Sequence, residues 1–289
     1  MKIAIVGGAG KMGRWFARFL LGDGKDVAIA GRNRERLLET GKELGVETMT
    51  GLKGIGSADV ILISVPIDSF GEVVEQISRH VRPGQIIVDI TSVKAFPVET
   101  MHRYLKDSLV LGVHPMFGPG ARDIANKNFV LTPTNEEEKA LARKVERYLQ
   151  AKGARATLMS PREHDEMMAI VLGLPSLIAT VSADTLLGFD KLGLAREIGG
   201  TTYKVLLMLA ESVVSEDPEL YASLQMRLPR IAEIGRLLGE RAGTWADLVE
   251  RQDRQAFIQR ASRLRSELKK ADPDFGSSYE DMYRVVEGL

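Results

Sequence analysis

The feature that most constrains the fold is a glycine-rich loop close to the N-terminus. The apolar segment Lys2–Val6 leads directly into Gly8-Ala9-Gly10-Lys11-Met12-Gly13, and a helical pattern begins after Gly10. In a strand–turn–helix unit of this kind, the first glycine permits a tight turn, the second lets the backbone approach a diphosphate, and the third permits close packing of helix on strand. Because free N–H groups at a helix N-terminus bind phosphate, the loop predicts a dinucleotide-binding site.

Short apolar runs alternate with helix-period segments from residue 2 to about residue 159. This alternation is typical of a parallel, doubly wound sheet, in which helices connect successive strands. We therefore expect a Rossmann domain over residues 1–160. The expected strands are Lys2–Val6, Val27–Ala30, Val60–Val65, Ile86–Ile90, Val110–Val113, Phe129–Thr132 and Ala156–Met159.

The sequence after Pro161 has a different pattern, in which long amphipathic segments replace the strands. We expect helices at roughly residues 163–187, 194–215, 217–240, 243–250 and 253–271, and hence an all-helical domain over residues 161–289. Segments such as Ala169–Leu187 are apolar around most of the helix. A mostly buried helix or a dimer interface would cover such a surface, and we expect a homodimer formed through the helical domain.

Charge and composition narrow the class of partner. Lys+Arg and Asp+Glu both total 39, so no net field attracts nucleic acid or an anionic membrane, and a small-molecule substrate is expected instead. The chain has no cysteine and only four histidines, which disfavours a metal site. The apolar run before the glycine loop is too short for a signal peptide, so a cytoplasmic location is expected.

The end of the second expected strand bears on the choice between NAD and NADP. A carboxylate there would bind the ribose 2′-hydroxyl and repel a 2′-phosphate, but the sequence is Ala30-Gly31-Arg32-Asn33-Arg34. Arg32 is a planar, permanently charged donor suited to a phosphate, with Asn33 or Arg34 assisting. The alternative is that these residues are solvated charges at a helix start. We expect NADP, with NAD possible.

Three further motifs follow expected strands, at the sheet edge where doubly wound folds bind ligands. They are Ser64-Val65-Pro66, Asp89-Ile90-Thr91-Ser92-Val93-Lys94 and His114-Pro115-Met116-Phe117-Gly118-Pro119. A histidine held at a strand end beside a nicotinamide would take a hydroxyl proton near neutral pH. A hydrogen-bonded turn residue is an equal alternative for His114.

These motifs, in this order, resemble the prephenate dehydrogenase family, and the resemblance continues through Glu163-His164-Asp165 and Asp217-Pro218. It implies NAD(P)-dependent oxidation of a 4-hydroxycyclohexadiene ring in tyrosine biosynthesis. Hydride would leave the carbinol carbon of prephenate or arogenate while His114 accepts the hydroxyl proton. Loss of the ring carboxylate would follow and give the aromatic product.

The resemblance also implies roles for neighbouring residues. Ser92 would bind the substrate hydroxyl or orient His114, with a helix N-cap as the alternative. Lys94 would support the loop, the cofactor or the substrate, with an exposed charge as the alternative. For His164 we favour a capping role at a helix start over catalysis.

The pattern departs from the family in the expected substrate pocket. Where the family has an arginine that binds the ring carboxylate, five residues before Asp217, this chain has Ser212. A family histidine is also missing where the chain has Gly173-Leu174-Pro175-Ser176. Binding of the ring carboxylate would then need another cation, for which Lys204, Arg227 and Arg230 lie nearby in sequence. The alternatives are a related dehydrogenase acting on another hydroxy acid or ring alcohol, and a non-catalytic NADP-binding protein.

Overall fold

The computed structural model describes residues 1–288, and these form two compact units. The first contains Met1–Met168 together with Met226–Leu228. The second contains Ala169–Gln225 and the chain from Pro229 onward. The expected boundary at residues 160 and 161 falls just before the helix α6 (Pro161–Met168), which belongs to the first unit.

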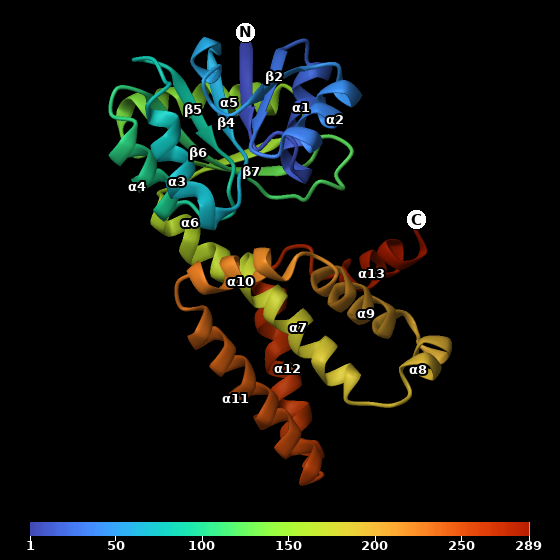
Figure 1. Ribbon diagram of the computed structural model, residues 1–289. Coiled ribbons are helices and arrows are strands. Elements are labelled where there is room, and N and C mark those ends of the chain that lie inside the picture. Colours follow the sequence, from blue (N-terminus) through green and yellow to red (C-terminus); the bar gives the residue numbers. More distant parts are fainter. Residues whose placement is uncertain (289) are drawn as a thin grey trace. The chain divides into compact units, whose positions relative to one another are not determined.

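The first unit is a Rossmann domain built on one eight-stranded sheet with the order β3-β2-β1-β4-β5-β6-β7-β8 (Figure 1). The order reverses direction between β1 and β4, and ligands of doubly wound sheets bind at such a point. The strands are β1 (Lys2–Val6), β2 (Asp26–Gly31), β3 (Glu47–Thr50), β4 (Val60–Ile63), β5 (Ile86–Asp89), β6 (Leu109–Pro115), β7 (Asn128–Thr132) and β8 (Arg155–Leu158).

Two features of the sheet differ from the expected pattern. Strand β3 was not predicted, because it lies at the sheet edge and buries only Met49. Strand β7 pairs antiparallel with β6, with His114 opposite Val130, whereas we expected a wholly parallel sheet. The reason is that no helix lies between β6 and β7, and a parallel connection needs a crossover segment, usually a helix.

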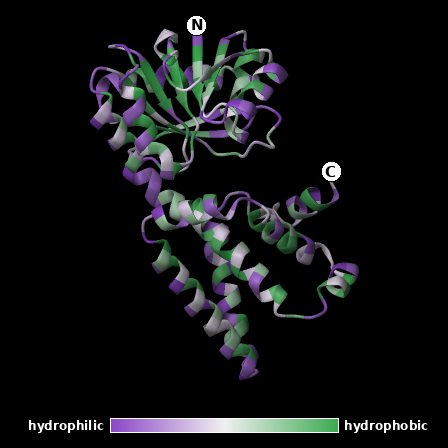
Figure 2. Cartoon of the chain, viewed as in Figure 1, coloured by the Kyte–Doolittle hydropathy of each residue, from purple (hydrophilic) through white to green (hydrophobic). Residues whose placement is uncertain are grey.

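Helices cover both faces of this sheet (Figure 1). On one face, Trp15, Phe16 and Leu20 of α1 join Leu141 and Leu149 of α5 in one apolar cluster with the strands. Figure 2 shows the strands as the most hydrophobic part of the unit, as expected for strands buried on both faces. The helices are α1 (Lys11–Gly22), α2 (Arg34–Leu44), α3 (Ile67–Ser78), α4 (Ala95–Tyr104), α5 (Glu136–Gln150) and α6 (Pro161–Met168).

The loop that follows β6 is anchored by an aromatic cluster. The Trp15 ring packs edge-on against Phe117, with 4.9 Å between ring centroids, and its Nε1 donates a hydrogen bond to the Ala121 carbonyl at 2.6 Å. Phe117 packs in turn against Phe129 of β7. These contacts hold the Pro- and Gly-rich segment after His114 against the sheet.

The second unit is all-helical, as predicted. It begins with a π-helical turn, Ala169–Gly173, where Pro175 lacks the N–H that a regular helix would use and the Ser176 hydroxyl donates to the Leu172 carbonyl. The expected helices 194–215 and 217–240 are each divided in two. The helices are α7 (Leu174–Leu187), α8 (Leu192–Ile198), α9 (Thr201–Val214), α10 (Pro218–Arg227), α11 (Ile231–Glu250), α12 (Arg254–Ala271) and α13 (Ser278–Glu287).

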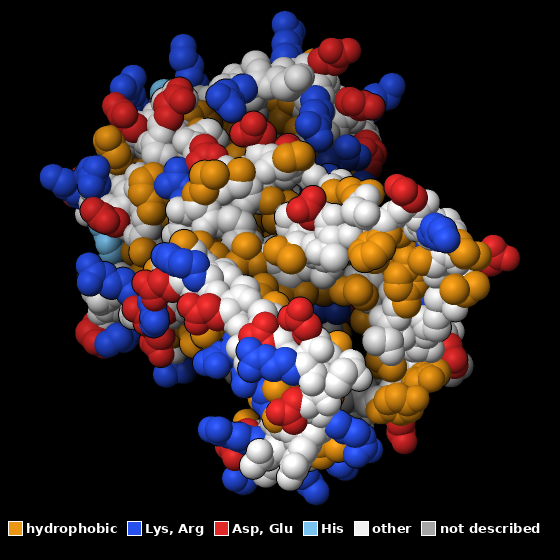
Figure 3. All heavy atoms as spheres, turned by 90° about the horizontal axis from the view of Figure 1, so that it is seen from below, with side chains coloured by type: hydrophobic (Ala, Val, Ile, Leu, Met, Phe, Trp, Pro, Cys, Tyr) orange, Lys and Arg blue, Asp and Glu red, His pale blue; other side chains and the backbone are white. Residues whose placement is uncertain are grey.

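Many large apolar side chains of these helices remain exposed. Val181 and Leu187 of α7 and Met208 of α9 are examples. Figure 3 shows hydrophobic side chains gathered in patches between charged ones on the face that it presents. Within residues 1–288, Pro161–Leu187 is the one helical segment long and apolar enough to cross a membrane by length and composition alone. Its first residues include the buried His164 and Asp165, which pack within the first unit.

Candidate active site

The glycine loop after β1 has the close contacts that a dinucleotide site requires. A Cβ added to Gly13 would lie 2.4 Å from the Gly7 carbonyl oxygen, so the third glycine permits the helix to approach the strand. The left-handed turn residue is Gly7, with φ of +82°, whereas we had assigned the tight turn to Gly8. Gly10 caps α1, and a Cβ there would meet only the Gly7 oxygen, at 3.2 Å.

Strand β4 brings a second predicted segment to this loop. The Ser64 N–H donates to the Val6 carbonyl at 2.8 Å, and a Cβ on Gly7 would collide with the Ser64 oxygen at 2.1 Å. Ser64 and Val65 therefore lie against the glycine loop, and Pro66 follows as the N-cap of α3. A dinucleotide at the β1/β4 switch point would lie between the glycine loop and the Ser64–Pro66 segment.

The end of β2 carries an exposed arginine. Arg32 follows the last strand residue, Gly31, and forms no ion pair among residues 1–288. The Asn33 side chain accepts a hydrogen bond from the Arg36 N–H at 3.0 Å and so caps α2. Asn33 thus has a structural task, while the Arg32 guanidinium is available to an anionic ligand.

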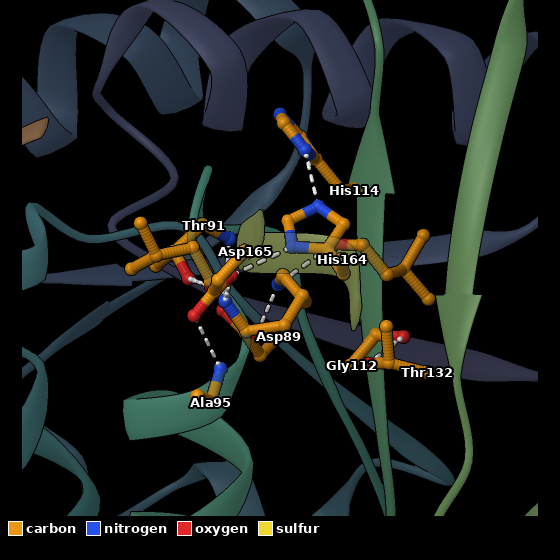
Figure 4. Close-up of polar contacts among 11 residues, drawn as sticks. Asp89, Thr91, Ala95, Gly112, His114, Thr132, His164 and Asp165 are labelled. Atoms are coloured by element: carbon orange, nitrogen blue, oxygen red, sulfur yellow. Dashed lines mark hydrogen bonds and ion pairs between the residues drawn. The ribbon is translucent and has the colours of Figure 1, made fainter. Parts of the chain in front are cut away.

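His114 lies at the C-terminal end of β6, where its side chain is buried and bonded to a second histidine. Its Nδ1 is 2.9 Å from Nε2 of His164 on α6, and the planes of the two rings make an angle of 67° (Figure 4). His164 Nδ1 lies 2.7 Å from Oδ1 of Asp165. The result is a continuous hydrogen-bonded chain from the carboxylate through two imidazoles.

Asp165 is itself held by the start of α4. Its Oδ1 accepts the Lys94 N–H at 2.7 Å and its Oδ2 accepts the Ala95 N–H at 2.9 Å. A carboxylate is well placed at a helix N-terminus, where unpaired N–H groups and the helix dipole both favour negative charge. This contact fixes α6, and with it His164, against the loop between β5 and α4.

The Lys94 side chain forms a fully buried ion pair with Asp89 at the end of β5. Its ammonium also donates to the Val113 carbonyl at 3.0 Å. The aliphatic stem passes over β6, because a Cβ on Gly112 would lie 3.1 Å from Lys94 Cδ. The exposed-charge alternative for Lys94 is therefore wrong, and its ammonium is enclosed by protein groups.

The two histidines sit in environments of different charge. Burial, the Lys94 ammonium and the second imidazole together hold the pKa of His114 well below 6.5. Burial and the Lys94 ammonium also lower the pKa of His164, but its hydrogen bond to Asp165 and the charges of Asp165 and Asp89 oppose that shift. The His114 imidazole is consequently uncharged at neutral pH.

Comparison with known proteins shows which family the chain resembles. Residues 16–158 match the family model described as prephenate dehydrogenase, nucleotide-binding domain. A relative from Methanocaldococcus jannaschii called "probable arogenate/prephenate dehydrogenase" is 31% identical over 282 residues, covering 96% of this chain. The chain belongs to the prephenate dehydrogenase family.

The match to other members extends over most of this chain. The T-protein of Haemophilus influenzae is 28% identical over 91% of it. The chain spans 61% of the length of the Methanocaldococcus relative and 66% of the T-protein. The crystal structure of A. aeolicus prephenate dehydrogenase with hydroxyphenyl propionate and NAD+ has a TM-score of 0.76 at 22% identity, covering 94% of this chain and 98% of that one. It shares the fold.

Not every residue taken from the family pattern joins the His114 network. Ser92 is partly buried in the loop before Lys94, and within residues 1–288 the polar partner of His114 is His164 rather than Ser92. The capping role favoured for His164 is wrong, because the Ser160 hydroxyl caps that helix by accepting the Glu163 N–H at 3.2 Å. His164 instead is fully buried beside His114.

Sequence reasoning missed the functions of Asp89, His164 and Asp165. Asp89 ends an apolar strand and precedes Lys94 by five residues, which was a signal for a buried pair. His164 and Met168 lie one helical turn apart and are both buried. The position of His164 on the same helix face as Met168 was therefore a signal that the histidine is buried.

The substrate residues expected in the helical part of the family pattern do not converge. Ser176 is buried, and its hydroxyl donates to the Leu172 carbonyl in the π-helical turn before α7. Lys204 and Ser212 are exposed and line the same open hollow along α9. Arg227 belongs to the first unit, where it bonds Asp68 at 2.7 Å and lies over the Phe96 ring. The Ser212 hydroxyl donates to the Leu209 carbonyl.

Proposed function

We propose that the protein is an NADP-dependent dehydrogenase that oxidises and decarboxylates prephenate or arogenate in tyrosine biosynthesis. The observation that carries the proposal is the buried, neutral His114 at the carboxyl edge of β6, hydrogen-bonded to His164 in a chain of this family. A non-catalytic nucleotide binder has no need of a base held in this way.

The residues of the first unit fit the cofactor that this reaction needs. Gly7, Gly8, Gly10 and Gly13 keep the β1–α1 turn clear of side chains, and Lys11 and Met12 form the first helical turn. A bound oxidised nicotinamide would accept hydride from the carbinol carbon of the substrate. Ser64, Val65 and Pro66 would border it at the switch point.

The chain's own chemistry is proton removal. Nε2 of His114 takes the proton of the ring hydroxyl as the carbonyl forms, and the resulting ketone drives loss of the ring carboxylate. Ser92 supplies a second hydroxyl near the reacting edge, where it would bind the substrate oxygen. Lys94 acts indirectly, since its enclosed ammonium holds the β5 loop and lowers the pKa of His114.

The cofactor preference rests on Arg32. Its exposed guanidinium at the end of β2 would bind the 2′-phosphate of NADP, and no strand-end carboxylate opposes it. NAD would bind the same site without this contact.

A second candidate is oxidation of a related hydroxy acid or ring alcohol. Ser212 stands where the family pattern has its carboxylate-binding arginine, and an uncompensated carboxylate is costly to remove from water. Lys204 lines the same hollow as Ser212 and would be a cation to replace the arginine.

The test is an assay of the purified protein with NADP or NAD and each of prephenate and arogenate, following absorbance of the reduced nicotinamide. Turnover of either acid, with NADP favoured, is expected. If the protein binds NADP and oxidises another ring alcohol but turns over neither acid, the first proposal is wrong and the second candidate function is supported.

We further propose a cytoplasmic homodimer formed through the second unit. Its exposed apolar side chains on α7, α9 and α12 exceed what isolated surface residues explain, and isologous dimers commonly cover such patches. Light scattering at micromolar concentration should give twice the chain mass. A clean monomer mass would refute the dimer and leave the dehydrogenase assignment untouched.

A further inference from the structure

The hydrogen bonds around Asp165 fix the direction of the chain that ends at His114. The Lys94 and Ala95 N–H groups can only donate, so both oxygens of Asp165 accept, and Nδ1–H of His164 donates the third bond. A neutral imidazole carries one N–H, which leaves Nε2 of His164 as an acceptor. The 2.9 Å contact then requires an N–H on Nδ1 of His114, and its lone pair lies on Nε2.

The charged groups around the pair decide where an added proton is more stable. The Lys94 ammonium disfavours a second positive charge on either imidazole, and His114 has no carboxylate in hydrogen-bond contact among residues 1–288 to offset it. His164 is bonded to Asp165 on its own helix and feels the negative charge of Asp89 on β5. An imidazolium is therefore better compensated at His164 than at His114.

We propose that His164 and Asp165 form a positioning pair that fixes the tautomer of His114 and holds the proton that His114 takes from substrate. The substrate O–H bond breaks as an N–H bond forms at Nε2 of His114, and the Nδ1 proton passes to Nε2 of His164. The O–H electron pair stays on oxygen and forms the carbonyl while the carbinol carbon loses hydride to the oxidised nicotinamide. The substrate step rests on the proposed function, but the tautomer does not.

The direct test is a ¹⁵N NMR titration of histidine-labelled protein, which has only four histidines. Signals of His114 and His164 are assigned by their loss in His114→Asn and His164→Gln. The expected result is a protonated Nδ1 and bare Nε2 on His114 at pH 8, and a first added proton that appears on His164. A bare Nδ1 on His114, or first protonation of His114, would overturn the inference whether or not the enzyme turns over prephenate.

A kinetic test separates proton holding from packing. Glutamine at position 164 would still accept the His114 Nδ1–H but would not hold a proton. His164→Gln should lower kcat on the order of 10- to 100-fold, as loss of an orienting partner typically does. The acid limb of the kcat/KM profile should also move to lower pH, because inactivation would then require protonation of His114 itself.

The matched control is His102→Gln, which breaks the other histidine–carboxylate pair of this unit, His102 with Glu138 at 2.6 Å. It should leave both kcat and the pH profile unchanged. A His164→Gln enzyme with a reduced rate but an unmoved acid limb would show a merely structural role and refute the positioning pair. If that variant failed to fold, the titration of the unaltered protein would still decide.

Discussion

The two units of the molecule hold their candidate residues in different ways. In the Rossmann unit, residues from β5, the N-cap of α4, β6 and α6 converge on a buried network of Asp89, Lys94, His114, His164 and Asp165. In the helical unit, Lys204 and Ser212 stay exposed. A parallel sheet brings the carboxyl ends of its strands to one edge, whereas a set of helices has no such rule. The first unit therefore contains the buried network on which the proposed chemistry rests, whereas the expected substrate residues of the second unit form no comparable cluster.

The largest expected effect comes from removing the base. His114→Asn should fold and bind NADP but lose turnover by on the order of 10²–10⁴-fold, the usual contribution of a general base. Stopped-flow measurement of reduced nicotinamide formation would show it, with NADP titration as the control for folding. Turnover close to that of the unaltered enzyme would mean that His114 is a structural residue and that the comparison between units is mistaken.

Breaking the buried ion pair should cost stability rather than chemistry alone. Lys94→Met leaves the Asp89 carboxylate buried without its cation, which typically costs about 3–5 kcal/mol of unfolding free energy. Urea unfolding followed by circular dichroism measures the loss. Lys139→Met, which removes the exposed partner of Glu136, is the control and should change stability little. Equal losses in the two variants would contradict the buried pair.

The cofactor end of the site is tested by Arg32→Ala. Loss of a charge-assisted bond to the 2′-phosphate should weaken NADP binding roughly 10- to 100-fold, since such bonds contribute about 1.5–3 kcal/mol. NAD binding should not change, and Arg36→Ala in the first turn of the adjacent helix α2 should affect neither cofactor. Calorimetric titration gives all of these affinities. Unaltered NADP affinity in Arg32→Ala would remove the basis for NADP preference.

The smallest effect is expected in the helical unit, where Ser212→Arg restores the family residue. If the exposed position on α9 faces bound substrate in the working enzyme, kcat/KM for prephenate should rise several-fold through the added carboxylate contact. The matched control is Ser215→Arg, which borders the same hollow and should give no rise. No gain from Ser212→Arg would favour a replaced cation or another substrate.

Much of the Rossmann unit could be predicted because its signals are local. The glycine loop, the apolar strands and the place of His114 at a strand end all follow from short segments of sequence. For Lys94 an exposed charge was the alternative to a supporting role, and for His164 a helix cap was favoured, because charged and polar residues are usually exposed. Their burial depends on partners supplied by other elements, Asp89 and Asp165, and such pairing is visible only after the chain has folded.

The helical unit was predictable only as a class. Its helices follow the expected apolar periodicity. The positions where helices end could not be predicted, because the apolar pattern continues without change through the π-turn at Ala169–Gly173 and the break after Ile198. The cation that would replace the missing arginine cannot be derived from spacing, since Arg227 belongs to the first unit and bonds Asp68.

The central claim is that a buried, neutral His114 acts as the base, and the pH profile of kcat/KM tests it most directly. Burial and the Lys94 charge lower the pKa of His114, and burial lowers that of His164, so the active, unprotonated pair persists as the pH falls below the ordinary histidine value of about 6.5. The account predicts a rate that stays constant through pH 6.5 and declines only at lower pH, with His114→Asn lacking this decline. An acid limb at or above pH 6.5 that persists in His114→Asn would contradict it and assign the proton to another group.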